Sequence, residues 1–169
     1  SFIVSSIRRR NLLRQLERMS YRDQLTQFGN RYAVDWFVEH EWNGEQIGVV
    51  YCDITGLKKV NDEQGHEAGD RLIIRACECL AGVFKGYGLY RIGGDEFLVL
   101  CLGIEEKDLR EHVEKLRMDM KEHQVTMAVG MIWKEHGPKD IDLLLNESER
   151  LMYEDKDRYY KKHGLKRRR

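Results

Sequence analysis

Tyr90-Arg91-Ile92-Gly93-Gly94-Asp95-Glu96-Phe97-Leu98-Val99-Leu100 is the most informative segment of this chain, because two apolar runs flank a Gly-Gly pair. Glycine reaches the positive φ angles of tight hairpin turns, so we predict a β-hairpin with strands near 88–92 and 96–102. The missing side chains also let a ligand approach the backbone, and the two carboxylates that follow offer oxygen ligands to a hard cation. The turn therefore suits a metal–phosphate site better than a core.

Composition limits what such a site can serve. The chain has 169 residues, enough for one domain with a full core. Lys plus Arg and Asp plus Glu each number 29, so we expect no nucleic-acid partner. Basic residues crowd 8–22 and 161–169, which we interpret as solvated helix ends and a tail, with a phosphate-rich partner as the alternative.

Cellular location is predicted from the cysteines and the N-terminal segment. The four cysteines lack a metal-ligand spacing and lie among apolar residues, which indicates buried thiols in a reducing cytosol. No secretory signal is present, and the apolar run at 2–4 is too short to cross a bilayer. Because the chain opens on Ser rather than Met, we expect a cytoplasmic piece of a longer protein, and a membrane segment upstream stays open.

Hydrophobic periodicity gives an alternation of helices and strands. Helices are predicted at 1–20, 31–41, 66–84, around 109–120 and around 141–152, and strands, besides the hairpin, at 46–52 and 125–131. A short helical piece follows Asp53, and a loop is predicted at 61–65. Because a hairpin interrupts the alternation, we predict an α/β (α+β) domain with a mixed sheet covered by helices.

Two aspartates lie where neighbouring strands would end. Asp53 closes the buried strand, and Asp95 lies at the hairpin turn. If the two strands are neighbours, both carboxylates emerge at one edge of the sheet. Such a pair suits Mg²⁺, which takes one or two protein carboxylates and leaves its other positions to water and substrate phosphates. The alternative is that both aspartates cap turns at strand ends.

A second polar cluster lies between Asn61 and Asp70. Asn and Asp side chains together offer donors and acceptors that match a purine edge. Asp70 is also predicted in the first turn of a helix, where a carboxylate is favourable to the helix dipole without any ligand. His66 has no nucleophile beside it in the sequence and is interpreted as a helix-start hydrogen-bonding residue.

Four ordered motifs resemble the GGDEF family, the diguanylate cyclases, over residues 20–162. The hairpin segment Arg91-Ile92-Gly93-Gly94-Asp95-Glu96-Phe97 is similar to the family's signature. The segment from Asp53 to Asp62, running on to Gly65-His66 and Gly69-Asp70, resembles its nucleotide-binding segment. The other two matches are Asp23-Gln24-Leu25-Thr26 with Asn30-Arg31, and Met152-Tyr153 with Lys156.

The resemblance implies a palm-like fold with a central mixed, largely antiparallel five-stranded sheet flanked by helices. It implies an N-terminal signalling helix over 1–22, the GGDEF domain over 23–163 and a basic tail over 164–169. Two domains would meet as a homodimer, each holding one GTP, and condense the two GTP into cyclic di-GMP with release of pyrophosphate. An upstream sensor domain would control how they meet.

Site residues carry over by position. The resemblance implies that Asp53, the backbone carbonyl of Ile54 and Asp95 hold Mg²⁺ or Mn²⁺, with Glu96 as a further ligand or as the group that activates the attacking hydroxyl. It also implies GTP binding by guanine-reading side chains, phosphate-binding backbone and ammonium groups, and turn glycines that give the nucleotide room: Asn61, Asp70, Gly56, Leu57, Lys58, Lys156, Gly93 and Gly94.

Several positions depart from the family's pattern. Thr55 replaces a usual second Asp near the metals, and Tyr160 replaces a usual phosphate-binding Arg. An active cyclase is therefore the first hypothesis, and a weak or inactive GTP-binding regulatory domain is the alternative. Phe84 and Tyr87 stand where the family's inhibitory site has Arg and Asp. We therefore expect no product-inhibition site, and the same loss argues against a cyclic di-GMP receptor.

Overall fold

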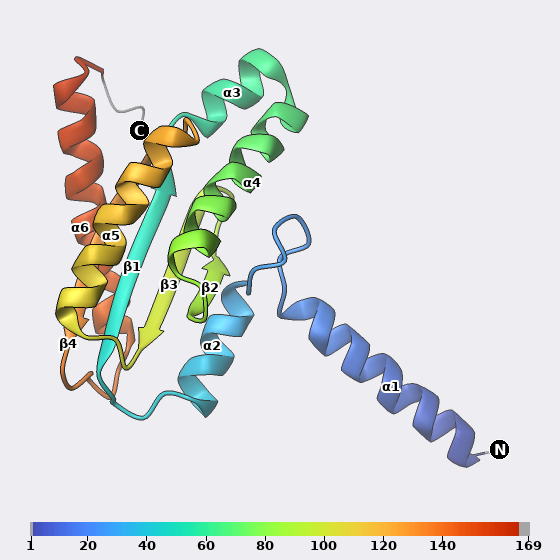
Figure 1. The fold of residues 1–169 in the computed structure, drawn as a ribbon. Helices are drawn as coiled ribbons and strands as arrows, with labels where there is room; N and C mark the ends of the chain where they lie inside the picture. The colour runs from blue at the N-terminus through green and yellow to red at the C-terminus, as the bar shows by residue number, and fades with distance from the viewer. Residues whose placement is uncertain (1, 166–169) are drawn as a thin grey trace.

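A computed structural model describes residues 2–165 of the chain as six helices and four strands (Figure 1). The elements are α1 (Phe2–Ser20), α2 (Arg31–His40), β1 (Ile47–Ile54), α3 (Leu57–Gln64), α4 (His66–Val83), β2 (Gly88–Arg91), β3 (Glu96–Leu102), α5 (Glu106–Glu122), β4 (Met127–Lys134) and α6 (Asp142–Lys162). The predicted hairpin and the predicted long helices are confirmed. The end of the predicted basic tail, 166–169, lies outside the described residues.

The four strands form one sheet in the order β2-β3-β1-β4. The α/β (α+β) class is confirmed, but the expected fifth strand is wrong for the residues described, 2–165. The apolar runs of the sequence had indicated four strands, and the stretch after β4 is polar, so no further run is available to pair. All three strand pairings are antiparallel, whereas we expected a mixed sheet. Helices α3 and α4 connect β1 to β2, which have β3 between them, and α5 connects β3 to β4, which have β1 between them. The strands that helices connect are therefore never neighbours in the sheet.

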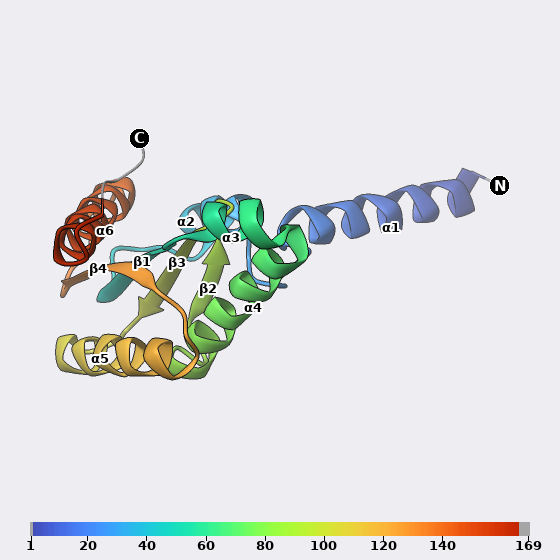
Figure 2. The ribbon, with the colours of Figure 1, turned by 90° about the horizontal axis from the view of Figure 1, so that it is seen from above.

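Helices cover both faces of the sheet (Figure 2). In β1 the side chains alternate: Val50, Cys52 and Ile54 pack with α4 and α5, while Val49 and Tyr51 pack with α2 and α6. Every residue of β1 is buried, as expected for a central strand covered on both sides. The sheet therefore has an apolar layer on each face, and polar side chains gather where its strands end.

The four cysteines lie in this apolar interior. Cys52, Cys77, Cys79 and Cys101 are all free thiols and all buried, as predicted. Burial raises the pKa of Cys52 to about 12, with similar shifts for the others. They therefore stay protonated and act as small apolar side chains.

Helix α1 projects away from the domain (Figures 1 and 2). The apolar side chains that the structure describes on this helix are exposed, among them Ile3 at 70%, Leu12 at 56% and Leu16 at 51%. The side-chain amide of Asn30 donates to the carbonyl of Ser20, the last residue of α1, and so ties the helix end to the loop before α2. Within residues 2–165, no helix combines the length and the apolar character needed to cross a bilayer.

Several local boundaries differ from the sequence prediction, and three of the differences concern predicted site residues. Strand β1 runs on to Ile54, so Asp53 lies inside the strand rather than after it. The predicted loop at 61–65 is wrong, because α3 continues to Gln64 and ends at Gly65, whose φ of 90° only glycine adopts readily. Asp70 is the fifth residue of α4 and lies past its first turn, where the dipole explanation for a carboxylate is weak.

Candidate active site

Strand pairing brings the predicted carboxylates together. Asp53 of β1 lies directly opposite Glu96 of β3 in the antiparallel register. One residue further on, the Ile54 amide donates to the Asp95 carbonyl at 2.8 Å. Because β1 and β3 are neighbours, the end of one strand meets the turn that begins the other. Asp53 and Asp95 therefore share one edge of the sheet, as expected for neighbouring strands, and Glu96 lies there with them.

The hairpin turn is held from outside by an arginine. The Arg91 guanidinium donates to the Gly94 carbonyl at 2.8 and 3.2 Å, and to both carboxylate oxygens of Asp23 at 3.2 Å. Asp23 in turn accepts from the Thr26 amide and hydroxyl. Although burial opposes it, these hydrogen bonds and the Arg91 charge lower the pKa of Asp23. Residues 23–26 and 91 thus fix the turn, a role that their motif resemblance alone did not indicate.

Lys156 lies against the carboxylate edge. Its ammonium is 3.2 Å from Asp53 Oδ1, and both side chains are largely buried, at 16% and 6% exposed. We had expected Lys156 to hold phosphates; in the structure it neutralises a carboxylate of the candidate metal site. Helix α6 can place it there because the helix packs closely on β4 and β1.

Glu96 is surrounded by negative charge. Its side chain is half-buried, and Tyr51 Oη donates to its Oε2 at 3.3 Å. Burial first, and then the nearby carboxylates of Asp53 and Asp95, raise the pKa of Glu96. Carboxylates that repel one another in a half-buried site are relieved by a divalent cation, so this donor set fits the predicted metal.

The metal would need ligands beyond the side chains. Among residues 2–165, no group of three or more His, Cys, Asp or Glu side chains is arranged to hold a metal ion by itself. Mg²⁺ is commonly held by one or two carboxylates plus substrate phosphates, so Asp53 and Asp95 with the Ile54 carbonyl suffice once a nucleotide supplies the rest. The set fits a site that the substrate completes.

The residues predicted to bind phosphate through their backbone lie at the start of α3. Gly56 has φ of 81° and precedes the first helical residues, Leu57 and Lys58. The first amides of a helix have no partner within it and point along its axis toward an anion. An added Cβ on Gly56 would meet nothing within 4 Å, so crowding does not explain the glycine. Its left-handed backbone conformation, which other residues rarely adopt, does.

Close packing sets the position of Asn61. A Cβ on Gly69 of α4 would lie 1.7 Å from Asn61 Oδ1 on α3, so only glycine leaves room for this amide. Asp70 follows directly and is exposed. The sequence predicted a loop at Asn61. In the structure Asn61 lies on α3, and its side chain packs against Gly69, the residue before Asp70.

The two turn glycines differ in their surroundings. A Cβ on Gly94 would meet nothing within 4 Å, so the space beside this glycine is open. A Cβ on Gly93 would lie 3.0 Å from Glu96 Oε2. Gly93 therefore leaves room for the Glu96 carboxylate.

The residues that depart from the family pattern contact groups other than the site carboxylates. The Thr55 amide donates to the Thr126 carbonyl at 2.8 Å, and its side chain lines a cavity between α5 and α6. Tyr160 stacks edge-on against Tyr159, with ring centroids 5.8 Å apart. Phe84 is completely buried, and both Phe84 and Tyr87 contact the His112 ring.

We expect Glu96→Gln to stabilise the metal-free protein at neutral pH. Since the folded-state pKa of Glu96 is raised above its ordinary value of 4.5, the folded state binds this proton more tightly than the unfolded state. Wild-type stability then falls as pH rises from that value through the raised pKa, whereas the Gln variant has nothing to titrate there.

Thermal unfolding of both proteins without divalent metal, from about pH 4 to pH 8, measures this effect. The difference in unfolding temperature between Glu96→Gln and wild type should grow as pH rises. The matched control is Glu114→Gln on the exposed face of α5, which should follow wild type throughout. An advantage that stays constant across the range would show that charge repulsion at Glu96 is not its origin.

Comparison with known proteins agrees with this geometry. The family described as "Diguanylate cyclase, GGDEF domain" matches residues 20–162. A bifunctional diguanylate cyclase/cyclic di-GMP phosphodiesterase, MucR of Pseudomonas aeruginosa, is 29% identical, covering 93% of this chain and 25% of its own length. The diguanylate cyclase DgcP of Escherichia coli is 28% identical, covering 81% of this chain and 45% of its own length.

The solved structures show the same fold. The coiled coil and GGDEF domain of DgcB from Caulobacter crescentus superposes with a TM-score of 0.78 at 21% identity, over 96% of this chain and 92% of that one. The chain spans less than half the length of the curated relatives named above. The sequence match over residues 20–162 and the shared fold lead to one conclusion: the chain belongs to the GGDEF domain family of the diguanylate cyclases.

Proposed function

We propose that this chain is the catalytic domain of a diguanylate cyclase, which condenses two GTP into cyclic di-GMP with release of two pyrophosphates and requires Mg²⁺ or Mn²⁺. One observation carries the proposal: Asp53, Asp95 and Glu96 meet at one sheet edge, beside an open Gly-Gly turn. Curated relatives that are named as diguanylate cyclases support it.

The proposed roles follow from position. Asp53, the Ile54 carbonyl and Asp95 would hold the metal, which supplies charge neutralisation at the phosphates. Glu96 would accept the proton of the attacking 3′-hydroxyl, a task for which its raised pKa makes it a stronger base than an ordinary carboxylate. The new bond joins O3′ of one GTP to the α-phosphorus of the other, and the bond to the β-phosphate oxygen breaks as pyrophosphate leaves.

Substrate binding is assigned to α3, α4 and α6. Asn61 and Asp70 would read the guanine edge, and the backbone at Gly56, Leu57 and Lys58 would cradle the β- and γ-phosphates. Lys156 would move from Asp53 to the phosphates once metal neutralises that carboxylate. Protein groups of this kind accelerate phosphoryl transfer mainly by positioning and charge stabilisation.

Catalysis would need a second copy of this domain, because each copy holds one GTP. The exposed apolar side chains of α1 are an unpartnered helix face that a second α1 would bury. We propose that an upstream sensor sets this helix pairing, and that the domain works in the cytoplasm.

The alternative is a GTP-binding regulatory domain without turnover, favoured by Thr55 and Tyr160. Incubation of the protein, dimerised through a coiled coil fused before α1, with GTP and Mg²⁺ separates the two. Mass spectrometry should detect cyclic di-GMP. Binding of GTP without any cyclic product in the dimerised protein would favour the regulatory domain.

We also predict no feedback inhibition through the position of the family's inhibitory site. Neither Phe84, which is buried, nor Tyr87, which is half-buried against His112, carries a guanidinium or a carboxylate. The pair of charged groups that would bind a cyclic dinucleotide is therefore missing. Calorimetric titration with cyclic di-GMP should give no affinity tighter than about 100 μM. Restoring the pattern with Phe84→Arg and Tyr87→Asp is the comparison, and tight binding by wild type at these residues would contradict the prediction.

A further inference from the structure

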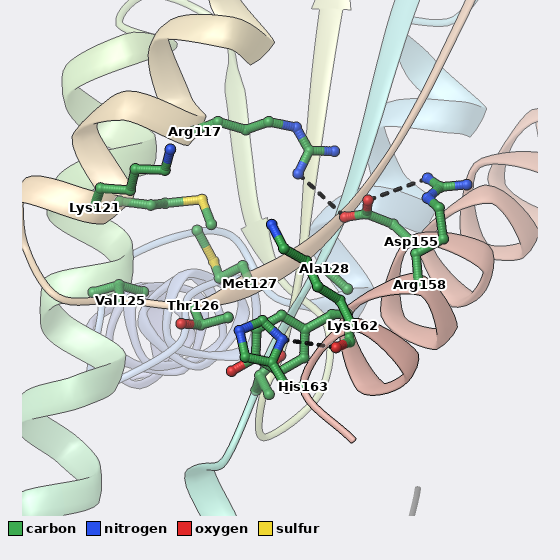
Figure 3. A pocket seen from close by; sticks show the side chains of 13 residues that line it. Arg117, Lys121, Val125, Thr126, Met127, Ala128, Asp155, Arg158, Lys162 and His163 are labelled. Atoms are coloured by element: carbon green, nitrogen blue, oxygen red, sulfur yellow. Dashed lines mark hydrogen bonds and ion pairs between the residues drawn. The ribbon is translucent and has the colours of Figure 1, made fainter. Parts of the chain in front are cut away.

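A cavity of about 480 Å³ opens between α5 and α6 at the free edge of β4 (Figure 3). Arg117 and Lys121 reach it from α5, and Arg158 and Lys162 reach it from α6. The hydroxyl-bearing Thr55 and Thr126 also line it, directly after β1 and directly before β4. Four cationic residues from two separate helices thus line one cavity.

A single carboxylate faces these cations. Asp155 accepts from the Val129 amide at 2.8 Å, from Arg117 at 3.3 Å and from Arg158 at 3.2 Å. Both of its oxygens therefore already accept hydrogen bonds, which link α5, β4 and α6. Within residues 2–165, neither Lys121 nor Lys162 forms an ion pair.

Helix ends explain only part of this charge. Lys121 and Lys162 lie in the last turns of α5 and α6, where a cation complements the helix dipole. Each helix end contributes about half a negative charge, so both together balance one of the four cations. Asp155 balances another. About two positive charges remain, which matches a phosphate group carrying about −1.5 to −2 at neutral pH.

We propose that the α5–α6 cavity binds a phosphate group, either as free phosphate or pyrophosphate or as the terminal phosphate of a nucleotide. The Lys121 and Lys162 ammonium groups pair with its oxygens across the groove, while the two arginines remain on Asp155. The cavity adjoins the candidate active site at Thr55, between Ile54 and Gly56, but its cations are not those of that site: Asp155 lines the cavity, whereas the next residue, Lys156, pairs with Asp53. The proposal therefore does not depend on cyclase activity.

Calorimetric titration of the whole chain with pyrophosphate, in EDTA at low salt, tests the proposal. Wild type should bind one pyrophosphate, and the double variant Lys121→Gln, Lys162→Gln should bind at least about tenfold more weakly, since two close charges are lost. The matched control, Lys85→Gln with Lys139→Gln, removes the same charge from surface positions outside the cavity and should bind like wild type. Parallel titrations with inorganic phosphate and with ATP identify which source of the phosphate group binds more tightly.

Three outcomes would overturn the proposal. The first is no binding to wild type. The second is an equal loss in the matched control, which would indicate unspecific attraction to surface charge. The third is binding that Lys156→Gln abolishes and the cavity variant leaves unchanged, which would place the pyrophosphate in the candidate active site. Because all the replaced lysines are exposed except Lys156, the cavity variant and its control should unfold at the wild-type temperature.

Discussion

Replacing Asp95 by Asn is expected to lower the rate of cyclic di-GMP formation by roughly 100- to 1,000-fold or more. The change keeps the shape of the side chain but removes the charge that would hold the metal. The backbone carbonyl of Asp95, which accepts from the Ile54 amide, is unaffected, so the hairpin should stay paired with β1. The measurement is mass-spectrometric quantification of cyclic di-GMP from dimerised protein, GTP and Mg²⁺.

The control for this prediction is Asp119→Asn on α5, which removes the same charge from a helix face distant in sequence from the site and should leave the rate unchanged. Thermal unfolding should give the same midpoint for Asp95→Asn and wild type to within a few degrees. An Asp95→Asn protein that retains a third of the wild-type rate would refute the metal-ligand role of this carboxylate. An inactive wild type would instead favour the regulatory domain.

Gly130→Ala is expected to destabilise the fold by about 3 kcal/mol, at the upper end for overpacking. Gly130 lies on β4 opposite Tyr51, and a Cβ there would lie 2.1 Å from the Ser148 carbonyl oxygen and 2.4 Å from the Met152 amide nitrogen. Both are backbone atoms of α6, which cannot move aside as a side chain can. The helix must shift, and Lys156 with it.

Chemical denaturation and thermal unfolding measure this effect, with an expected fall in Tm of roughly 6–12 °C for a domain of this size. The control is Gly82→Ala near the end of α4, where an added Cβ meets nothing within 4 Å and φ is not positive. Alanine there should be neutral or stabilise by up to about 1 kcal/mol. If Gly130→Ala were as stable as wild type, α6 would be able to move away from β4 at little cost, contrary to this prediction.

The elements were predictable because their signals are local. The apolar stripe of α4 and the alternation in β4 repeat within a few residues, so they predict a helix and a strand without knowledge of neighbours. The Gly-Gly pair predicted the hairpin turn for the same reason. Boundaries failed where a contact from elsewhere decides them, as for Asn61, which is helical and packs against the backbone of Gly69.

The sequence by itself therefore determined the family, the order of elements and the carboxylates of the candidate site, because motifs and periodicity are properties of short segments. Only the tertiary structure decided which charges meet. Lys156 pairs with Asp53 across 103 residues, and Arg91 reaches Asp23 across 68. Such pairs form where helix packing and strand register bring distant residues within a few ångströms, and no spacing along the chain encodes that distance.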